Sequence, residues 1–138
     1  MPKTYPIVVI PGDGIGPEVT DATLKVLAAA DAPLTYHTHQ AGLPAMEASG
    51  EVMPAATLDA IREHKTAIKG PCTTPVGKGF RSVNVQLRQT LGLYAAIRPV
   101  RNLEGVKTRY ENVDLVVFRE NTEGLYTGIE NEITPGVV

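Results

Sequence analysis

The sequence contains a single cysteine, Cys72, among its 138 residues. One cysteine cannot form an intrachain disulfide, and it cannot build a cysteine–metal cluster. The charge excess is also small, because 13 Lys and Arg oppose 15 Asp and Glu and leave a net charge of −2. A nucleic-acid-binding protein would carry a strong positive excess. Nucleic acid is therefore not an expected partner.

Long apolar runs are absent as well. No run approaches the roughly 18 residues that a membrane-spanning helix needs, and residues 1–6 lead into a strand-like run without a signal-peptide profile. We therefore expect no membrane association and a cytoplasmic location. Apolar residues make up 43% of the chain and charged residues 20%. This is ordinary globular usage and argues against wholesale disorder.

Strand-like and helix-like segments alternate in the first part of the chain. The β-branched run 7–10 predicts a buried strand, and Pro17 opens a helix that ends near Ala30. Further strands are expected over 34–39 and 66–69, helices over 54–65 and 82–90, and a loop with a weak helical piece over 41–53. This alternation is typical of βαβ units around a parallel sheet.

The later part of the chain is richer in strands. Residues 93–100 are apolar except for one arginine, residues 113–118 predict a buried strand, and residues 125–133 predict another. The change of pattern suggests that the chain crosses into a second layer or domain. Because residues 133–138 end on a turn signal, we expect a fragment of a longer protein.

The glycine-rich segment 12–17 admits two interpretations. It follows a strand and precedes a helix, as a dinucleotide-binding fingerprint does. However, Pro17 stands where that fingerprint requires its third glycine, and no acidic residue ends the second strand. A tight strand-to-helix turn is therefore favoured, and a Rossmann site is the minor alternative.

Three arginines suggest a local cationic pocket. Arg88 lies on a predicted helix, Arg98 interrupts an apolar strand, and Arg119 ends the run 113–118. A buried arginine needs an anionic partner, and guanidinium groups bind carboxylates and phosphates through paired hydrogen bonds. A small polyanion is one candidate partner. The alternative, local pairing with acidic side chains, stays open; the candidates are Glu104, Glu111, Glu120 and Glu123.

Two further features have weaker signals. The segment 70–81 can cradle an anion with backbone N–H groups and threonine hydroxyls, although a flexible surface loop explains it equally well. Tyr126 is a possible proton donor or simply a packed tyrosine. Cys72 and the histidines show no catalytic or metal-binding spacing.

Taken together, four segments resemble the isocitrate and isopropylmalate dehydrogenases, the β-decarboxylating dehydrogenase family. They are IPGDGIGPE (10–18), KGPCTTPVGKGFRSVNVQLRQ (69–89), LYAAIRPVR (93–101) and FRENTEGLYTGIE (118–130). The resemblance implies an α/β, isopropylmalate-dehydrogenase-like fold: a parallel-rich sheet with flanking helices, not Rossmann, and truncated. Residues 1–119 would form the N-terminal part of the large domain, and residues 120–138 the start of the small domain.

The resemblance also implies roles for individual residues. The three arginines (Arg88, Arg98 and Arg119) match those that hold the α- and β-carboxylates of the substrate. Tyr126 matches the tyrosine that acts in proton transfer after decarboxylation. Ser82 and Asn84 match the pair that contacts the third carboxylate of isocitrate. Thr73 and Thr74 match threonines near the nicotinamide end of the cofactor, where Asn84 also lies.

The activity implied by the resemblance is oxidative decarboxylation of isocitrate to 2-oxoglutarate. Its cofactors would be NAD or NADP together with Mg²⁺ or Mn²⁺, and the full-length enzyme would be a homodimer. The family's metal-binding aspartates and catalytic lysine have no match among these residues, so we expect the chain alone to be inactive. Homoisocitrate, tartrate or isopropylmalate is an alternative substrate, and a non-catalytic truncated module is an alternative function.

Overall fold

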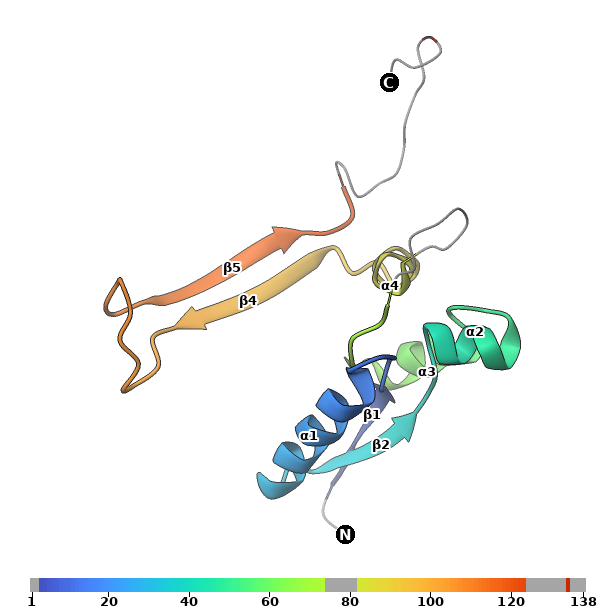
Figure 1. Ribbon diagram of the computed structural model, residues 1–138, viewed down its shortest axis with the longest axis horizontal. Helices are drawn as coiled ribbons and strands as arrows, with labels where there is room; N and C mark the ends of the chain where they lie inside the picture. The colour runs from blue at the N-terminus through green and yellow to red at the C-terminus, as the bar shows by residue number, and fades with distance from the viewer. Residues whose placement is uncertain (1–2, 74–81, 124–133, 135–138) are drawn as a thin grey trace. The chain divides into compact units, whose positions relative to one another are not determined.

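The computed structural model describes residues 3–73, 82–123 and 134, and it contains two compact units (Figure 1). The first unit spans residues 1–87 and the second spans residues 88–138. The predicted boundary between the large and the small domain, at residues 119 and 120, does not coincide with this division into compact units, and it stays a prediction. No helix within the described ranges is long and apolar enough to cross a membrane.

The first unit is a parallel sheet with helices. Its strands are β1 (Tyr5–Ile10), β2 (Leu34–Thr38) and β3 (Ala67–Lys69), and its helices are α1 (Gly16–Ala29), α2 (Leu43–Ser49) and α3 (Ala55–His64). A further helix, α4 (Val83–Thr90), begins in this unit and ends in the second. The predicted strands and helices of this part are confirmed, and α2 is the helical piece expected within 41–53.

The strand order β2-β1-β3 places β1 at the centre of the sheet, and β1 runs parallel to both neighbours. Val8, Val9 and Ile10 have at most 1% of their surface exposed. A parallel strand is covered on both faces, so it needs a continuous apolar run rather than an alternating one. The sequence 7–10 has this pattern, and α3 packs against β1.

Helix α1 begins directly after the glycine-rich segment. Pro17 occupies its first turn, where a missing N–H leaves no hydrogen bond unmade. Gly16 and Thr20 are buried, and the Thr20 hydroxyl donates a hydrogen bond of 3.3 Å to the Pro11 carbonyl. The start of the helix is thereby tied to the end of β1.

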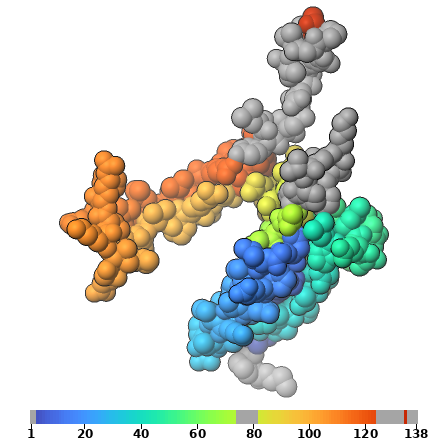
Figure 2. Space-filling model, viewed as in Figure 1, coloured from blue at the N-terminus to red at the C-terminus, as the bar shows by residue number. Residues whose placement is uncertain are grey.

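The second unit is built on an antiparallel ribbon of two strands, β4 (Ala95–Arg101) and β5 (Asp114–Glu120). Figure 2 shows the two strands packed against each other along their lengths. The predicted burial of residues 113–118 is wrong. Phe118 is 69% exposed and Leu115 is 58% exposed, because a two-stranded ribbon has no second layer of its own to cover either face. The predicted strand over 125–133 lies outside the described residues.

Candidate functional site

The loops that follow β1, β2 and β3 meet at one edge of the parallel sheet. Parallel strands all end at the same edge, and ligands of open α/β sheets bind outside that carboxyl edge. The loops comprise residues 11–15, 39–42 and 70–73. The Asp13 carboxylate joins them, because Oδ1 accepts the Thr73 N–H at 2.6 Å and Oδ2 accepts the Leu43 N–H at 3.2 Å.

The glycines of segment 12–17 allow two backbones to touch. Gly12 has φ +80°, and a Cβ at this position would lie 1.9 Å from the Pro71 carbonyl oxygen. A Cβ on Gly16 would lie 2.7 Å from the same oxygen. The Asp13 N–H also donates to Pro71 O at 3.0 Å. These glycines therefore serve a tight turn packed on the loop after β3, which is the favoured interpretation of the sequence.

The environment of Asp13 keeps its carboxyl group ionised. Asp13 is 8% exposed. Burial alone would raise its pKa, but hydrogen bonds from Thr73 and Leu43 and the charge of Lys69 outweigh burial and lower the pKa from its ordinary 3.8. The edge of the sheet therefore holds a buried negative charge, each of whose oxygens accepts a protein N–H.

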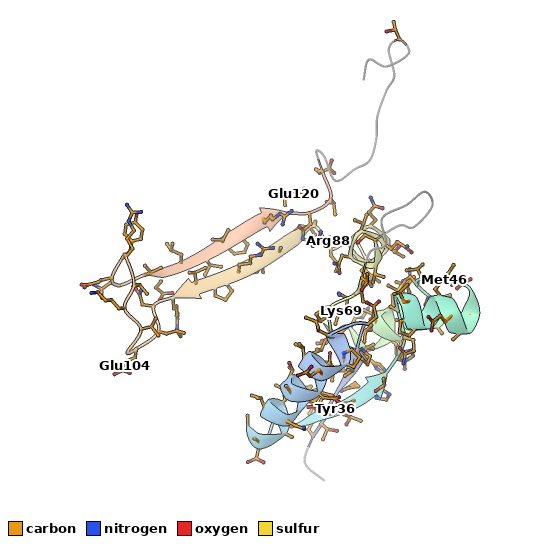
Figure 3. All side chains as sticks on the ribbon, viewed as in Figure 1. Tyr36, Met46, Lys69, Arg88, Glu104 and Glu120 are labelled. Atoms are coloured by element: carbon orange, nitrogen blue, oxygen red, sulfur yellow. The ribbon has the colours of Figure 1, made fainter. Side chains whose placement is uncertain are left out.

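Cys72 lies beside this carboxylate, and its thiol pKa is shifted in the opposite direction. Burial raises the pKa of the Cys72 thiol from 9.0, against the opposing effect of Lys69. Lys69 donates to the Gly70 carbonyl at 2.5 Å, and its Nζ lies 3.8 Å from the Cys72 sulfur (Lys69 is labelled in Figure 3). A thiol with a raised pKa is mostly protonated at neutral pH and is a poor nucleophile.

The β4–β5 ribbon brings Arg98 and Arg119 to one of its faces. Arg98 is opposite Val117 and Arg119 is opposite Ala96. Residues opposite each other share a face, as do residues two apart on one strand, so the two arginines are diagonal neighbours. Diagonal positions on a ribbon are separated by about 7–8 Å. A small molecule with two carboxylates can bridge such a pair.

The opposite face of the ribbon carries a different arginine. Arg101 Nε lies 3.0 Å from Asp114 Oδ1, in an exposed ion pair. Glu120 is also on that face, and it accepts hydrogen bonds from the Thr122 hydroxyl, the Thr122 N–H and the Glu123 N–H. Hydrogen bonds from Thr122 and from the Glu123 backbone lower the Glu120 pKa to about 2. This carboxylate orders the turn that follows Arg119.

Arg88 enters the second unit at the end of α4. The Leu93 N–H donates to the Arg88 carbonyl at 2.8 Å, and the Asn121 N–H donates to the Tyr94 carbonyl at 3.0 Å. The segment that follows α4 is thus joined to the end of β5, next to Arg119. The structure places Arg98 and Arg119 on one face, and it places Arg88 in the same unit on the helix that leads into the ribbon.

Ser82 and Asn84 lie at the beginning of α4, and both are half-buried. Asn84 and Arg88 are four residues apart on this helix and so lie on one of its faces. Thr73 is exposed at the carboxyl edge of the sheet. Two other predicted site residues, Thr74 and Tyr126, lie outside the described residues.

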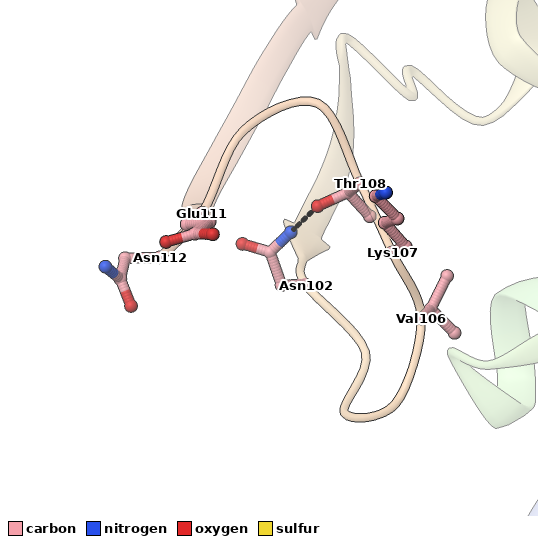
Figure 4. A pocket seen from close by; sticks show the side chains of 6 residues that line it. All are labelled: Asn102, Val106, Lys107, Thr108, Glu111 and Asn112. Carbon is pink, nitrogen blue, oxygen red and sulfur yellow. Dashed lines mark hydrogen bonds between the residues drawn. The ribbon is translucent and has the colours of Figure 1, made fainter.

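A cavity of about 370 Å³ lies in the connection between β4 and β5 (Figure 4). All of its lining residues except Val106 are polar or charged, and the Asn102 amide donates to the Thr108 hydroxyl at 2.8 Å. None of the predicted site residues lines it. Within residues 3–73, 82–123 and 134, no three His, Cys, Asp or Glu side chains gather in a way that can hold a metal ion.

Asp13 is a residue that sequence reasoning missed. Its signal in the sequence is an acid placed between two glycines, directly after a buried strand. An aspartate at such a position can accept hydrogen bonds from backbone N–H groups when the loops after neighbouring strands pack against its turn. Sequence alone cannot identify those donors, because Leu43 and Thr73 are 30 and 60 residues away.

Comparison with known proteins gives consistent matches. A family profile described as isocitrate/isopropylmalate dehydrogenase matches residues 6–137. The NADP isocitrate dehydrogenase of Thermus thermophilus is 52% identical, over 95% of this chain and 27% of its own length. The probable mitochondrial NAD isocitrate dehydrogenase alpha subunit of Drosophila melanogaster is 48% identical, over 98% of this chain and 36% of its own length. The crystal structure of isocitrate dehydrogenase from Methylococcus capsulatus matches with a TM-score of 0.83 and 52% identity, covering 95% of this chain and 39% of that one.

Proposed function

The chain belongs to the isocitrate/isopropylmalate dehydrogenase family, and we propose that it forms part of an enzyme that oxidatively decarboxylates isocitrate to 2-oxoglutarate. It spans 27–39% of the lengths of the relatives named above. "Full-length enzyme" here means a protein that joins this chain to the remaining segments of such a relative. The activity, substrate and homodimeric assembly are proposals for that full-length enzyme.

The observation that carries the proposal is the shared ribbon face of Arg98 and Arg119. Each guanidinium group can hold one carboxylate through two parallel hydrogen bonds. The pair therefore fixes two carboxylates of one substrate at a set separation. Binding at two points limits rotation of the substrate and holds its reacting carbon in place. Arg88, at the end of α4, is the proposed third cation.

The proposal of isocitrate rests on Ser82 and Asn84. A hydroxyl and an amide offer hydrogen-bond donors to a third carboxylate, whereas an apolar isopropyl group would leave them without partners. An unpaired buried polar group costs about 1–3 kcal/mol. The pair therefore favours a tricarboxylate over isopropylmalate, and it separates isocitrate less clearly from homoisocitrate or tartrate.

Thr73, an exposed residue, and the Asn84 amide would hold a nicotinamide cofactor, and Thr74 belongs to the same proposal. When bound, the cofactor supplies the acceptor for the hydride of the substrate's carbinol carbon. The relatives named above include both an NAD and an NADP enzyme. The described residues do not form a metal site, so the Mg²⁺ or Mn²⁺ of the proposal would use ligands elsewhere. Tyr126 is the proposed proton donor to the carbon after decarboxylation.

A chimera tests this proposal. Residues 1–138 would replace the matching segment of the Methylococcus capsulatus enzyme, which is 52% identical. We expect the purified chimera to reduce NAD or NADP with isocitrate at least about tenfold more efficiently than with isopropylmalate. A hydrogen bond to the third carboxylate is worth about 1.5–3 kcal/mol, and about 1.4 kcal/mol corresponds to tenfold. Preference for isopropylmalate, homoisocitrate or tartrate would refute the isocitrate assignment.

A non-catalytic role is the second candidate for the 138-residue chain by itself. The supporting observation is that the chain spans at most 39% of the lengths of the relatives named above. We expect a sample confirmed by intact mass to show no isocitrate-dependent reduction of NAD or NADP. Turnover by such a sample would contradict the view that the chain holds only part of the site.

A further inference from the structure

Asp13 is the one side chain described here that holds all three loops at the carboxyl edge of the sheet. It lies in the loop after β1 and accepts the Leu43 N–H from the start of α2. It also accepts the Thr73 N–H from the loop after β3, at 2.6 Å. One carboxylate thus binds backbone N–H groups from two distant parts of the sequence, the start of α2 and the loop after β3.

The surroundings leave this carboxylate little freedom to move. A Cβ on Gly42 would lie 2.7 Å from Asp13 Oδ2 and 3.6 Å from the Cys72 sulfur. Gly42 itself has φ +81°, a conformation that glycine adopts without strain. The chain therefore uses glycine at this position, which lets the carboxylate approach the start of α2.

Two acceptor oxygens are required for this arrangement. A carboxylate offers an acceptor to each of two N–H groups, whereas an asparagine amide offers one acceptor and one donor group. With asparagine at position 13, an NH₂ group would face the N–H of either Leu43 or Thr73. One loop would lose its hydrogen bond and meet a donor instead.

We propose that Asp13 is a positioning residue for the nicotinamide end of the active site: its carboxylate sets the place of Thr73 relative to the start of α2. This inference rests on the proposed function, because Thr73 is proposed there to lie beside the cofactor. Asp13 acts here through Thr73, because the carboxylate is buried and each of its oxygens accepts a protein N–H. The lowered pKa of Asp13 means that this arrangement persists through neutral and mildly acidic pH.

The test uses the 138-residue chain labelled with ¹⁵N and ¹³C. In the unaltered chain, we expect a scalar coupling across the hydrogen bond from the Thr73 nitrogen to the Asp13 carboxyl carbon. On acidification, the Thr73 amide resonance should titrate with a midpoint below 3.8. The ionisable groups that act on Asp13 are Lys69 and the thiol of Cys72, and neither is a carboxyl group. Asp13 is therefore the group that this titration reports.

Asp13→Asn should accelerate hydrogen exchange of the Leu43 and Thr73 amides by about tenfold or more, because one of them loses its acceptor and the other exchanges a charged acceptor for a neutral one. It should also abolish the acid titration of the Thr73 amide. The control is Thr57→Val, which removes a different buried hydrogen bond of the same unit, from the Thr57 hydroxyl to the Gln40 carbonyl at 2.8 Å. The control should leave the titration and the Thr73 exchange rate unchanged.

The cofactor half is tested by titrating NAD⁺ or NADP⁺ into the chimera and into its Asp13→Asn and Thr57→Val variants, because the 138-residue chain by itself holds only part of the site. We expect the dissociation constant of the nucleotide to be at least about fivefold higher in Asp13→Asn, which is equivalent to about 1 kcal/mol. It should be unchanged in Thr57→Val. Wild-type titration and exchange at Thr73 in Asp13→Asn would overturn the positioning role. If Asp13→Asn does not fold, absence of the scalar coupling in the unaltered chain overturns it instead. If Thr73 exchange depends on Asp13 but the dissociation constant of the nucleotide in the chimera does not, Asp13 holds the loop and its proposed link to the cofactor is refuted.

Discussion

Adding one methyl group at Gly12 should destabilise the first unit far more than adding it at Gly50. Both glycines have a positive φ, +80° and +76° respectively. A Cβ on Gly12 would meet the Pro71 carbonyl oxygen at 1.9 Å, whereas a Cβ on Gly50 would meet nothing within 4 Å. The two alanine variants therefore share the conformational cost and differ in the steric clash.

The expected magnitudes follow from these contacts. Alanine with a positive φ costs about 1 kcal/mol in either variant. In Gly12→Ala the backbone at Pro71 must also move, which disturbs the hydrogen bonds from Asp13 N to Pro71 O and from Gly70 N to Ile10 O. Loss of two such bonds adds about 2 kcal/mol. We expect a loss in unfolding free energy of about 3 kcal/mol for Gly12→Ala and about 1 kcal/mol for Gly50→Ala.

Urea unfolding followed by far-ultraviolet circular dichroism measures both losses. For a unit of this size, 1 kcal/mol corresponds to a melting-temperature shift of about 4–8 °C, so thermal unfolding is a second readout. Equal losses for Gly12→Ala and Gly50→Ala would refute the close packing of the two loops. If segment 12–17 were instead a Rossmann fingerprint, Gly12→Ala would abolish nucleotide binding and would be about as stable as Gly50→Ala.

Three further predictions concern charged and polar groups. In the chimera, Arg98→Met or Arg119→Met should lower kcat/KM for isocitrate by at least about tenfold, while Arg101→Met, on the opposite ribbon face, should have little effect; a similar loss in all three would contradict the shared-face site. Ser82→Leu should weaken isocitrate more than malate-like substrates without a third carboxylate, and equal losses across a substrate panel would show that Ser82 does not contact that carboxylate. The Asp13 pKa is lowered from 3.8 in the folded chain, so the ionised carboxylate contributes to stability above pH 3.8, and this contribution disappears as the pH falls through the pKa of the folded state. Between pH 7 and 3, the urea midpoint should therefore fall less steeply for Asp13→Asn than for the unaltered chain. Parallel curves would argue against a lowered Asp13 pKa.

The local structure of the first unit follows from its sequence. The β-branched run 7–10 has no polar interruption, so it forms the central buried strand β1. Pro17 and the glycines before it set the turn and the first turn of α1. These elements depend on neighbouring residues, and for that reason sequence patterns predict them.

Motif resemblance extended the prediction to the family and to its site residues. The four matching segments run in order along the chain, and the family profile matches residues 6–137. Composition and periodicity by themselves left two interpretations open for the arginines, pairing with nearby acids or a shared pocket. The register of β4 and β5 places Arg98 and Arg119 on one face, and it places Arg101 beside Asp114 on the other. Register depends on how two strands pair, and neither strand encodes that pairing alone.

Tertiary structure also determined what the sequence pattern misjudged. Residues 115–118 are apolar, which predicted burial, yet they are exposed in a two-stranded ribbon. Burial depends on the layers that surround a strand, and the strand's own composition does not specify them. Asp13 shows the same limit for polar groups. Its donors lie 30 and 60 residues away, and they meet the carboxylate only because parallel strands end at one edge of the sheet.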